Sequence, residues 1–419
     1  MRFKSEPFSI QPPQSHVHIH SVRLRLRSYG IRAKLLTNVY WCNKMALPFE
    51  FHWSGQNSDE ASDITYRAVR WSAILDVAIE LSGDNQCAFD GRYHAGGRHI
   101  VRRITVPARA TTWLAKVPIV LASEPGRNWN SQRRFTMESE IATMIHISSK
   151  TNIPIPEVFG YDTSMEGNPA GLPFILMQCI QGNTVFDMGG PQILNSLQKT
   201  MVLESIASMQ CQLLHAGVDQ IGCLVMASNG GIDIGKLPQE FGLQGPFTQP
   251  ADFFWSWVAN NRTFKNLEQL ADVDLKRATE AFPTRLASVI DKLTANNVVR
   301  NYPIVHPDLG MHNILLNNDY EVVGVIDWEG AYSAPIDVFA ARTNMFASLD
   351  VDNGILAINA EGIDYESVIA SMEKDDESIH VLLTALRSVV GGLSLCMKMY
   401  EEGRAMRFDR FIENIERGL

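Results

Sequence analysis

The stretch VHPDLGMHNILLNNDYEVVGVIDWE, residues 305–329, decides the fold of this chain. Asp308 and Asn313 stand five positions apart, the H-x-D-x-x-x-x-N spacing of phosphoryl-transfer loops, in which the Asp receives a hydroxyl proton and the Asn binds magnesium. Asp327 follows the β-rich run at 322–326, so a buried strand is expected to bring its carboxylate to the same edge. These three side chains are the candidate catalytic and metal-binding residues.

The chemistry explains why these residue types occur at this spacing. A phosphoryl group in transfer carries charge on its equatorial oxygens, so catalysis is mainly positioning and charge neutralisation, and carboxylate and amide oxygens suit Mg²⁺. The segment is predicted to form a loop followed by a hairpin with strands at 313–316 and 321–328. This arrangement would direct Asp308 toward the hydroxyl, and Asn313 and Asp327 toward the metal.

A structural alternative is open, because Asp and Asn are also favoured in turns, and a lone D-x-x-x-x-N motif would favour that interpretation. Here His306 lies two residues before Asp308, Ile-Leu-Leu follows Asn313 directly, and the Asp of Ile-Asp-Trp-Glu lies fourteen residues after Asn313. The combination favours the catalytic interpretation.

These motifs resemble those of the aminoglycoside phosphotransferase and choline kinase superfamily, in particular its fungal aminoglycoside-phosphotransferase-like branch. Trp328-Glu329 stands where a protein kinase has Phe-Gly, and residues 334–337, Ala-Pro-Ile-Asp, are similar to the family's P-x-D rather than to the kinase A-P-E. The resemblance covers about residues 85–345. One departure is Pro307, at a position where the family usually has Gly or Arg.

The resemblance implies an α+β fold of the bilobal protein-kinase-like type, with a small antiparallel-sheet N-lobe and a larger helical C-lobe. It also implies a nucleoside triphosphate donor, ATP or GTP, with Mg²⁺ and a small-molecule acceptor. The expected N-lobe is residues 45–180, and the expected C-lobe is residues 181–419 with a catalytic segment at 304–337. A kinase-like scaffold without turnover, acting as a binding protein, is the alternative function.

The composition is that of an ordinary globular protein, with 419 residues, 45% hydrophobic and 20% charged, enough for two lobes. The absence of an apolar run of about 18 residues argues against a membrane span, and the formal net charge of -9 argues against a nucleic-acid partner. Six cysteines occur without CxxC pairing, which predicts reduced thiols and a cytoplasmic location. The alternate histidines at 16–20 are interpreted as incidental rather than as metal ligands.

Residues 1–44 differ in charge from the rest of the chain. They contain eight Lys or Arg and one acid, so the remaining residues carry -9 minus 7, or -16. An Arg-rich, acid-poor start is typical of a mitochondrial transit peptide, and Met45 could equally be the true start. We therefore expect a disordered basic leader outside the fold.

The N-lobe is predicted to begin with a helix at 58–81 and to continue with a strand-turn-strand. Gly91, Gly96 and Gly97 precede the alternating pattern of Ile100, Arg102 and Ile104. The tip at Gly96 and Gly97 is a candidate for covering phosphates, and a plain hairpin turn explains the glycines nearly as well.

The next strand, at 112–119, carries one basic residue, Lys116. The resemblance places there the Lys or Arg that binds the α- and β-phosphates, whereas the alternative is an exposed strand lysine. Its acidic partner is expected on the helix at 134–149, where Glu140 lies beside the apolar face and Glu138 is the rival.

Residues 152–158 resemble the family's I-P-V-P-x-V entry to a strand, in which prolines keep the chain extended. A buried strand and a linker follow at 172–182. The resemblance implies that the backbone of Gln178, Cys179 and Ile180 binds the adenine edge. In the C-lobe, helices are predicted at residues 194–215, 253–270, 275–296 and, as one or two helices, 365–400.

Overall fold

The computed structural model describes residues 59–120, 128–237, 244–265, 267–295, 301–340, 346, 348–350, 355–357, 363–372, 376–388 and 391–418. The basic leader predicted at 1–44 lies outside these residues.

The chain divides into two compact units. Among the described residues, unit 1 is drawn from Gly55–Trp129 and Phe159–Gln178, and unit 2 from Asn130–Val158 and Cys179–Leu419. The helix predicted at 134–149 belongs to unit 2. The predicted boundary between the two lobes, at residues 180 and 181, stays a prediction.

Unit 1 is built on a five-stranded sheet with strand order β1-β2-β3-β5-β4. Adjacent pairs along β1, β2, β3 and β5 are antiparallel. Every second side chain of β2 is buried, as the alternation of Ile100, Arg102 and Ile104 predicted. The strands are β1 (Ala88–Ala95), β2 (His99–Val106), β3 (Thr111–Pro118), β4 (Val158–Asp162) and β5 (Phe174–Gln178), with a 3-10 turn at Pro107–Arg109.

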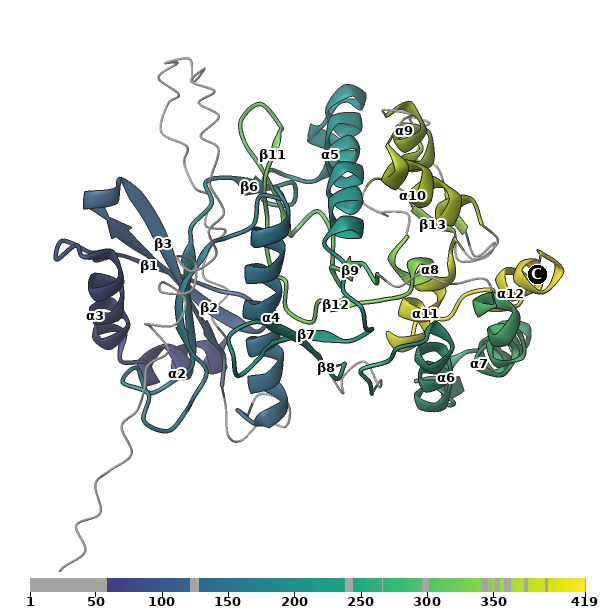
Figure 1. Ribbon diagram of the computed structural model, residues 1–419, viewed down its shortest axis with the longest axis horizontal. Coiled ribbons are helices and arrows are strands. Elements are labelled where there is room, and N and C mark those ends of the chain that lie inside the picture. The colour runs from purple at the N-terminus through teal and green to yellow at the C-terminus, as the bar shows by residue number, and fades with distance from the viewer. Residues whose placement is uncertain are drawn as a thin grey trace, which may run out of the picture. The chain divides into compact units, whose positions relative to one another are not determined.

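Two helices, α2 (Glu60–Ala68) and α3 (Trp71–Ser82), replace the single helix predicted at 58–81. The chain leaves the helix because Arg70 bonds elsewhere: its N–H donates to the Ala170 carbonyl at 2.9 Å and its Nη2 to the Asn168 carbonyl at 3.0 Å. These long-range contacts override a local pattern that is compatible with one helix. The apolar face of α3 then packs on the sheet through Ile74, Ala78 and Leu81 (Figure 1).

Unit 2 contains the hairpin predicted from the catalytic segment. Strands β10 (Ile314–Leu316) and β11 (Val322–Val325) pair antiparallel, and β6 (Asn183–Thr184) adds a third strand beside β10. Two long helices also belong to this unit, α4 (Ser131–Lys150) and α5 (Ser196–His215). Each begins at an asparagine whose side chain accepts a backbone N–H, Asn130 for α4 and Asn195 for α5.

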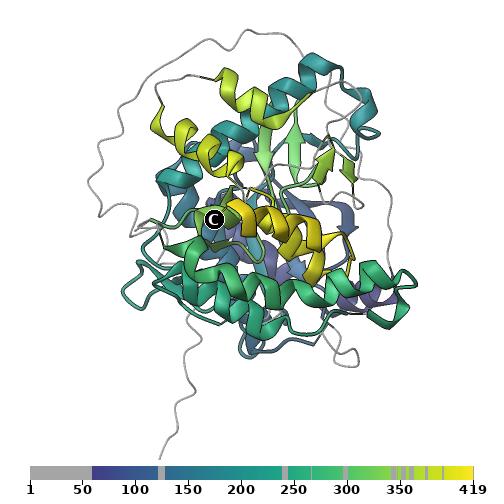
Figure 2. The same ribbon diagram turned by 90° about the vertical axis from the view of Figure 1, so that its right-hand side faces the viewer.

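The helical part of unit 2 surrounds a large aromatic core. Helices α6 (Pro250–Asn260) and α7 (Val273–Thr294) pack together, and α12 (Phe408–Gly418) lies along α7 (Figures 1 and 2). Of the four aromatics predicted from the sequence to be core residues, Phe253, Phe254 and Trp257 are each at most 1% exposed, whereas Trp255 is 43% exposed and is not part of the core.

Two helix predictions in this unit were too long. The helix predicted at 253–270 ends at Asn260, because the Asn261 side chain donates to the Trp257 carbonyl at 2.9 Å and the next helix-like turn is separate. The one or two helices predicted at 365–400 are three. Asp376 accepts the Ser378 N–H at 2.8 Å and so starts a new helix. The three helices are α9 (Tyr365–Ser371), α10 (Glu377–Arg387) and α11 (Leu393–Glu401).

The remaining elements of unit 2 are short: 3-10 turns Pro191–Ile193 and Leu267–Gln269, helix α8 (Ile336–Phe339), and strands β7 (Cys223–Met226), β8 (Ile232–Gly235), β9 (Ile304–Val305), β12 (Tyr332–Ser333), β13 (Ser348–Asp350) and β14 (Ile355–Ala357). Among the described helices, none has the length and apolar character needed to cross a bilayer.

The aromatic core gives a stability prediction. Phe282 of α7 is fully buried and stacks on Phe408 with ring centroids 4.7 Å apart. Phe282→Ala is expected to lower the free energy of unfolding by about 3–5 kcal/mol, because it removes apolar contacts and leaves a cavity. Urea denaturation measures this change. Val273→Ala is the matched control, since Val273 starts the same helix and is 67% exposed. Equal losses in the two variants would contradict this assignment of the core.

Candidate active site

Four hydrogen bonds close a ring through the catalytic loop and the end of the hairpin. The Asp308 N–H donates to His306 Nδ1 at 3.1 Å, and Asn313 Nδ2 donates to the Asp308 carbonyl at 2.8 Å. The Ile326 N–H donates to the Asn313 carbonyl at 2.9 Å, and His306 Nε2 lies 3.0 Å from the Ile326 carbonyl. Because residue 326 closes the ring, Asp308, Asn313 and the following Asp327 are held in one cluster. The structure therefore brings the three predicted residues together.

His306 is the buried support of this ring. Its Nδ1 accepts a backbone N–H, so Nε2 carries the proton and donates to the Ile326 carbonyl. Burial lowers the pKa of His306 below the ordinary imidazole value, which favours this neutral form. The ring of Trp328 packs edge-on against it, with centroids 4.7 Å apart. His306 therefore orients the loop and does not face a substrate.

Asp308 presents its carboxylate to solvent. The side chain is 56% exposed, with Oδ2 2.7 Å from His312 Nε2 and Oδ1 3.8 Å from Lys398 Nζ. Sequence reasoning missed both neighbours. His312 stands four residues after Asp308, a local signal that could have suggested contact, whereas Lys398 lies in α11 and carried no such signal. An exposed, oriented carboxylate is what a general base needs to meet a hydroxyl.

Asn313 and Asp327 fit a magnesium site by their chemistry. Asn313 is buried, and its Nδ2 is occupied by the Asp308 carbonyl, so the amide is fixed with Oδ1 as its ligand atom. Asp327 is exposed and has a backbone φ of +62°, a left-handed conformation that is uncommon outside glycine. Such strain costs on the order of 1–3 kcal/mol and persists where surrounding structure enforces it, often at functional sites.

The linker after β5 packs on the catalytic hairpin. A Cβ added to Gly324 would lie 3.0 Å from Ile180 Cγ2, and one added to Gly182 would lie 2.9 Å from Val323 Cγ2. These close approaches explain why glycine occupies both positions. The predicted linker residues Cys179 and Ile180 belong to unit 2, while Gln178 ends β5 in unit 1. The chain therefore passes from one unit to the other within the predicted adenine-binding segment.

The candidates of unit 1 lie on the sheet. Lys116 is in β3, opposite Val101 of β2, and is only 8% exposed, which rules out the exposed-lysine alternative. Gly96 and Gly97 form the turn between β1 and β2, where the Gly96 N–H donates to the His99 carbonyl at 2.9 Å. A Cβ at Gly97 would meet no atom within 4 Å, so the turn has open space beside it. The phosphate-binding roles of Lys116 and of the turn at Gly96 and Gly97 stay predictions.

Glu140 and its rival Glu138 differ in environment. Glu140 lies in α4 of unit 2 and is 3% exposed. Glu138 is on the surface of the same helix and forms an i,i+4 ion pair with Arg134, Oε1 to Nε 2.8 Å. A buried carboxylate needs a charged or hydrogen-bonding partner, and this favours Glu140 over Glu138. Its predicted pairing with Lys116 joins residues of different units and stays a prediction.

Glu401, at the end of α11, is a second unusual carboxylate. Trp257 Nε1 donates to its Oε1 at 2.6 Å. Burial raises the pKa of Glu401 from 4.5 to about 7, with Glu402 adding to the rise and the Trp257 bond, Lys265 and Lys398 opposing it.

This raised pKa predicts a pH-dependent stability. The folded state binds the Glu401 proton more tightly than the unfolded state, so the contribution is full below pH about 4.5 and is lost as pH rises through about 7. Glu401→Gln keeps an acceptor for Trp257 and is expected to be more stable than wild type at pH 8 and to flatten this part of the profile. Thermal melts from pH 4 to 8 measure it, with Glu166→Gln as control, since Glu166 is an exposed acid in unit 1. A wild-type-like slope in Glu401→Gln would contradict the assignment.

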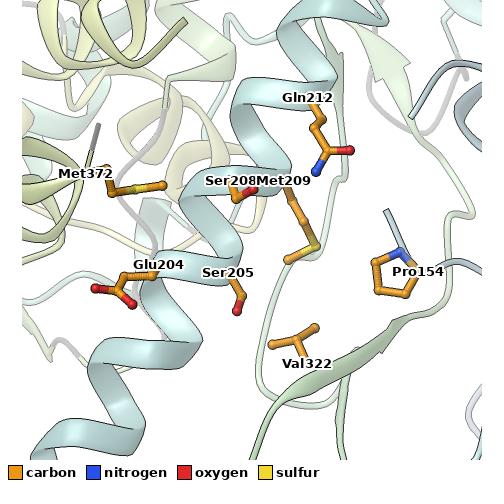
Figure 3. Close-up of a pocket in the computed structure, with 8 residues that line it drawn as sticks. All are labelled: Pro154, Glu204, Ser205, Ser208, Met209, Gln212, Val322 and Met372. Atoms are coloured by element: carbon orange, nitrogen blue, oxygen red, sulfur yellow. The ribbon is translucent and has the colours of Figure 1, made fainter. Parts of the chain in front are cut away.

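A cavity of about 540 Å³ lies elsewhere on the hairpin. Figure 3 shows α5 on one side and β11 on the other. Val322 is the first residue of β11, at the opposite end of the strand from Asp327. The cavity is therefore distinct from the catalytic cluster. Its lining residues are Pro154, Glu204, Ser205, Ser208, Met209, Gln212, Val322 and Met372.

Comparison with known proteins agrees with the chemistry expected of the cluster of Asp308, Asn313 and Asp327. Residues 101–338, more than half of the chain, match the family model described as "Phosphotransferase enzyme family". The chain belongs to this family. Membership, together with an antiparallel sheet unit and a mainly helical unit, confirms the predicted α+β protein-kinase-like fold.

Individual relatives are more distant. The chain is 25% identical over 206 residues to "Clavilactone A biosynthesis cluster protein Y" of Ampulloclitocybe clavipes, covering 47% of this chain and 50% of that protein. Hence it spans about half the length of this curated relative. Among solved structures, it is similar to a protein of Ralstonia eutropha provisionally assigned as an aminoglycoside phosphotransferase (13% identity, 84% and 99% coverage of the two chains, TM-score 0.48). It is also similar to an ethanolamine kinase of Plasmodium vivax (12% identity, 87% and 95% coverage, TM-score 0.45).

Proposed function

We propose that this protein is a small-molecule kinase, which moves the γ-phosphoryl group of ATP or GTP to a hydroxyl of its acceptor. The observation that carries the proposal is the closed hydrogen-bond ring, because it gathers an exposed carboxylate and two oxygen ligands into one cluster. Membership of a phosphotransferase family supports the same reaction class.

Asp308 is the general base of the proposed reaction. The acceptor hydroxyl gives its proton to this carboxylate as its oxygen attacks the γ-phosphorus, and the bond from the γ-phosphorus to the β-phosphate bridging oxygen breaks with its electron pair left on the nucleoside diphosphate. The bond from His312 to Oδ2 fixes the carboxylate plane. Removal of the hydroxyl proton during attack lowers the activation free energy of phosphoryl transfer. An Asp that only shaped a turn would not have this effect.

Asn313 and Asp327 are the proposed magnesium ligands, through amide and carboxylate oxygens. Bound there, magnesium would neutralise charge on the β- and γ-phosphate oxygens. Lys116, held by Glu140, is proposed to bind the α- and β-phosphates, and the turn at Gly96 and Gly97 to cover them. The backbone of residues 178–180 is proposed to receive the base.

The acceptor class we propose is a secondary metabolite or an aminoglycoside-like compound. The name of the fungal relative assigns that protein to a biosynthesis cluster, and this supports a specialised metabolite as the acceptor here. Fold and catalytic motif alone do not select the acceptor, since one fold serves many chemistries.

A labelled-nucleotide screen tests the proposal. Purified protein is incubated with magnesium, ATP carrying a γ-phosphate label and fractionated fungal metabolite extracts, and the products are separated chromatographically. We expect label to move to a small molecule in at least one fraction and the variant Asp308→Asn to form little of that product. Label that stays in ATP, or goes only to inorganic phosphate, would favour the scaffold alternative.

A further inference from the structure

The side chain of Lys398, far from Asp308 in the sequence, places a positive charge next to the Asp308 carboxylate. Lys398 of α11 places its Nζ 3.8 Å from Asp308 Oδ1 and donates a hydrogen bond to the Pro307 carbonyl at 3.2 Å. We propose that Lys398 is a further catalytic residue, which contacts the phosphoryl group as it reaches the acceptor hydroxyl. This inference rests on the proposed function.

The position of Lys398 is fixed by its helix. The residues on either side of it, Met397 and Met399, and the nearby Cys396 and Tyr400 are buried in the aromatic core of unit 2. The backbone that carries Lys398 is therefore held in place, whereas its side chain is 45% exposed. A fixed backbone together with the contacts to Pro307 and Asp308 holds the ammonium group beside the catalytic carboxylate, where a positioned charge is most effective.

The charges around Asp308 explain the need for this cation. Lys398 faces Asp308, Glu402, whose Oε1 is 3.9 Å away, and the charge of Glu401. Arg404 Nη1 also lies 3.4 Å from Glu402 Oε2, and Lys265 acts on Glu401, so these outer acids have cations of their own. Lys398 is the lysine beside Asp308 Oδ1, where the arriving phosphoryl group adds further negative charge. Without a cation there, repulsion from the carboxylates would oppose transfer.

The geometry separates Lys398 from the magnesium residues. Asn313 binds the Asp308 backbone carbonyl, whereas Lys398 approaches the Asp308 side chain and the carbonyl of Pro307. A hydroxyl hydrogen-bonded to Asp308 is thus within reach of the Lys398 ammonium. In the proposed step Lys398 stays protonated and exchanges no proton, so it adds charge stabilisation to the base chemistry of Asp308.

Amine rescue of Lys398→Ala tests this role. We expect kcat for transfer to the acceptor to fall by roughly 10²-fold, the effect of removing one transition-state donor, with little change in the KM for ATP. Ethylammonium in the assay is expected to restore part of kcat, because the exposed site admits a small cation with N–H donors. Tetramethylammonium, which has charge but no donor, is expected to restore much less. Lys398→Arg is expected to retain more activity than Lys398→Ala.

Lys265→Ala is the matched control, because Lys265 Nζ binds the Glu401 carbonyl of the same helix and does not touch Asp308. This variant should keep the wild-type kcat, and ethylammonium should not change its kcat. If Lys398→Ala fails to fold, Lys398→Met, which retains the apolar stem, tests the loss of kcat, and Lys398→Arg tests its recovery; amine rescue is read only in Lys398→Ala, since methionine leaves no space for the amine. Wild-type kcat in the Lys398 variants, or a loss that no amine restores, would overturn the inference alone. Absence of phosphoryl transfer by wild type would overturn the proposed function and this inference with it.

Discussion

Asp308→Asn is expected to lower kcat by roughly 10²- to 10⁴-fold, the usual effect of removing a general base. The substitution keeps the size of the side chain and an oxygen that can bond His312, but it removes the carboxylate that receives the hydroxyl proton. The hydrogen-bond ring uses the backbone N–H and carbonyl of residue 308, so it remains intact. Steady-state kinetics with the acceptor found in the screen measures the change.

Nucleotide affinity provides the internal control for this variant. The proposed ligands of magnesium and the phosphates lie elsewhere, so Kd for magnesium-ATP should stay within about threefold of wild type, a change below 1 kcal/mol. An unchanged kcat in Asp308→Asn would remove the residue from the chemistry. A parallel loss of ATP binding would show that Asp308 acts on the donor instead.

Asp327→Ala is expected to abolish most of the magnesium-dependent stabilisation by ATP. A ligand that binds only the folded state raises stability by RT ln(1 + [L]/Kd), which is about 2.7 kcal/mol at one hundred times Kd. Removing a carboxylate ligand of the metal weakens the bound complex, so the shift in Tm should shrink toward that of ATP without magnesium. Thermal melts with ATP, with and without magnesium, measure it.

Asp319→Ala is the matched control, since Asp319 is an exposed acid in the turn of the same hairpin. This variant should show the full magnesium-dependent shift. The positive φ of Asp327 also means that alanine there is strained, so each comparison uses the difference between ligand-bound and ligand-free Tm of one variant. An equal shift in wild type and Asp327→Ala would exclude Asp327 from the metal site.

Local patterns explain which elements could be predicted. The alternation along β2, the hairpin that follows Asn313 and the long apolar faces of α4, α5 and α7 all depend on residues close in sequence. The interruption between α2 and α3 could not be read this way, because Arg70 leaves the helix to bond residues almost one hundred positions away.

The candidate active site likewise contains residues that the sequence could reveal and residues that it could not. Asp308, Asn313 and Asp327 were predicted from their types and spacing, since the proposed reaction demands hard oxygen groups in a fixed order along the loop and hairpin. Lys398 was not, because its contact with Asp308 arises only when α11 packs beside the catalytic loop. The raised pKa of Glu401 was equally hidden, since it results from burial of the carboxylate beside Trp257.

Sequence alone indicated the phosphotransferase family and the fold class of this protein and predicted the residues that would supply oxygen ligands, because these are encoded in short motifs whose spacing is set by the backbone. Only the tertiary structure decided the neutral form of His306, the left-handed backbone conformation at Asp327 and the position of Lys398 beside Asp308. Each of these features depends on burial from water or on contact between segments that are distant in sequence. Burial and such contacts exist only in the folded chain, so local sequence patterns do not reveal them.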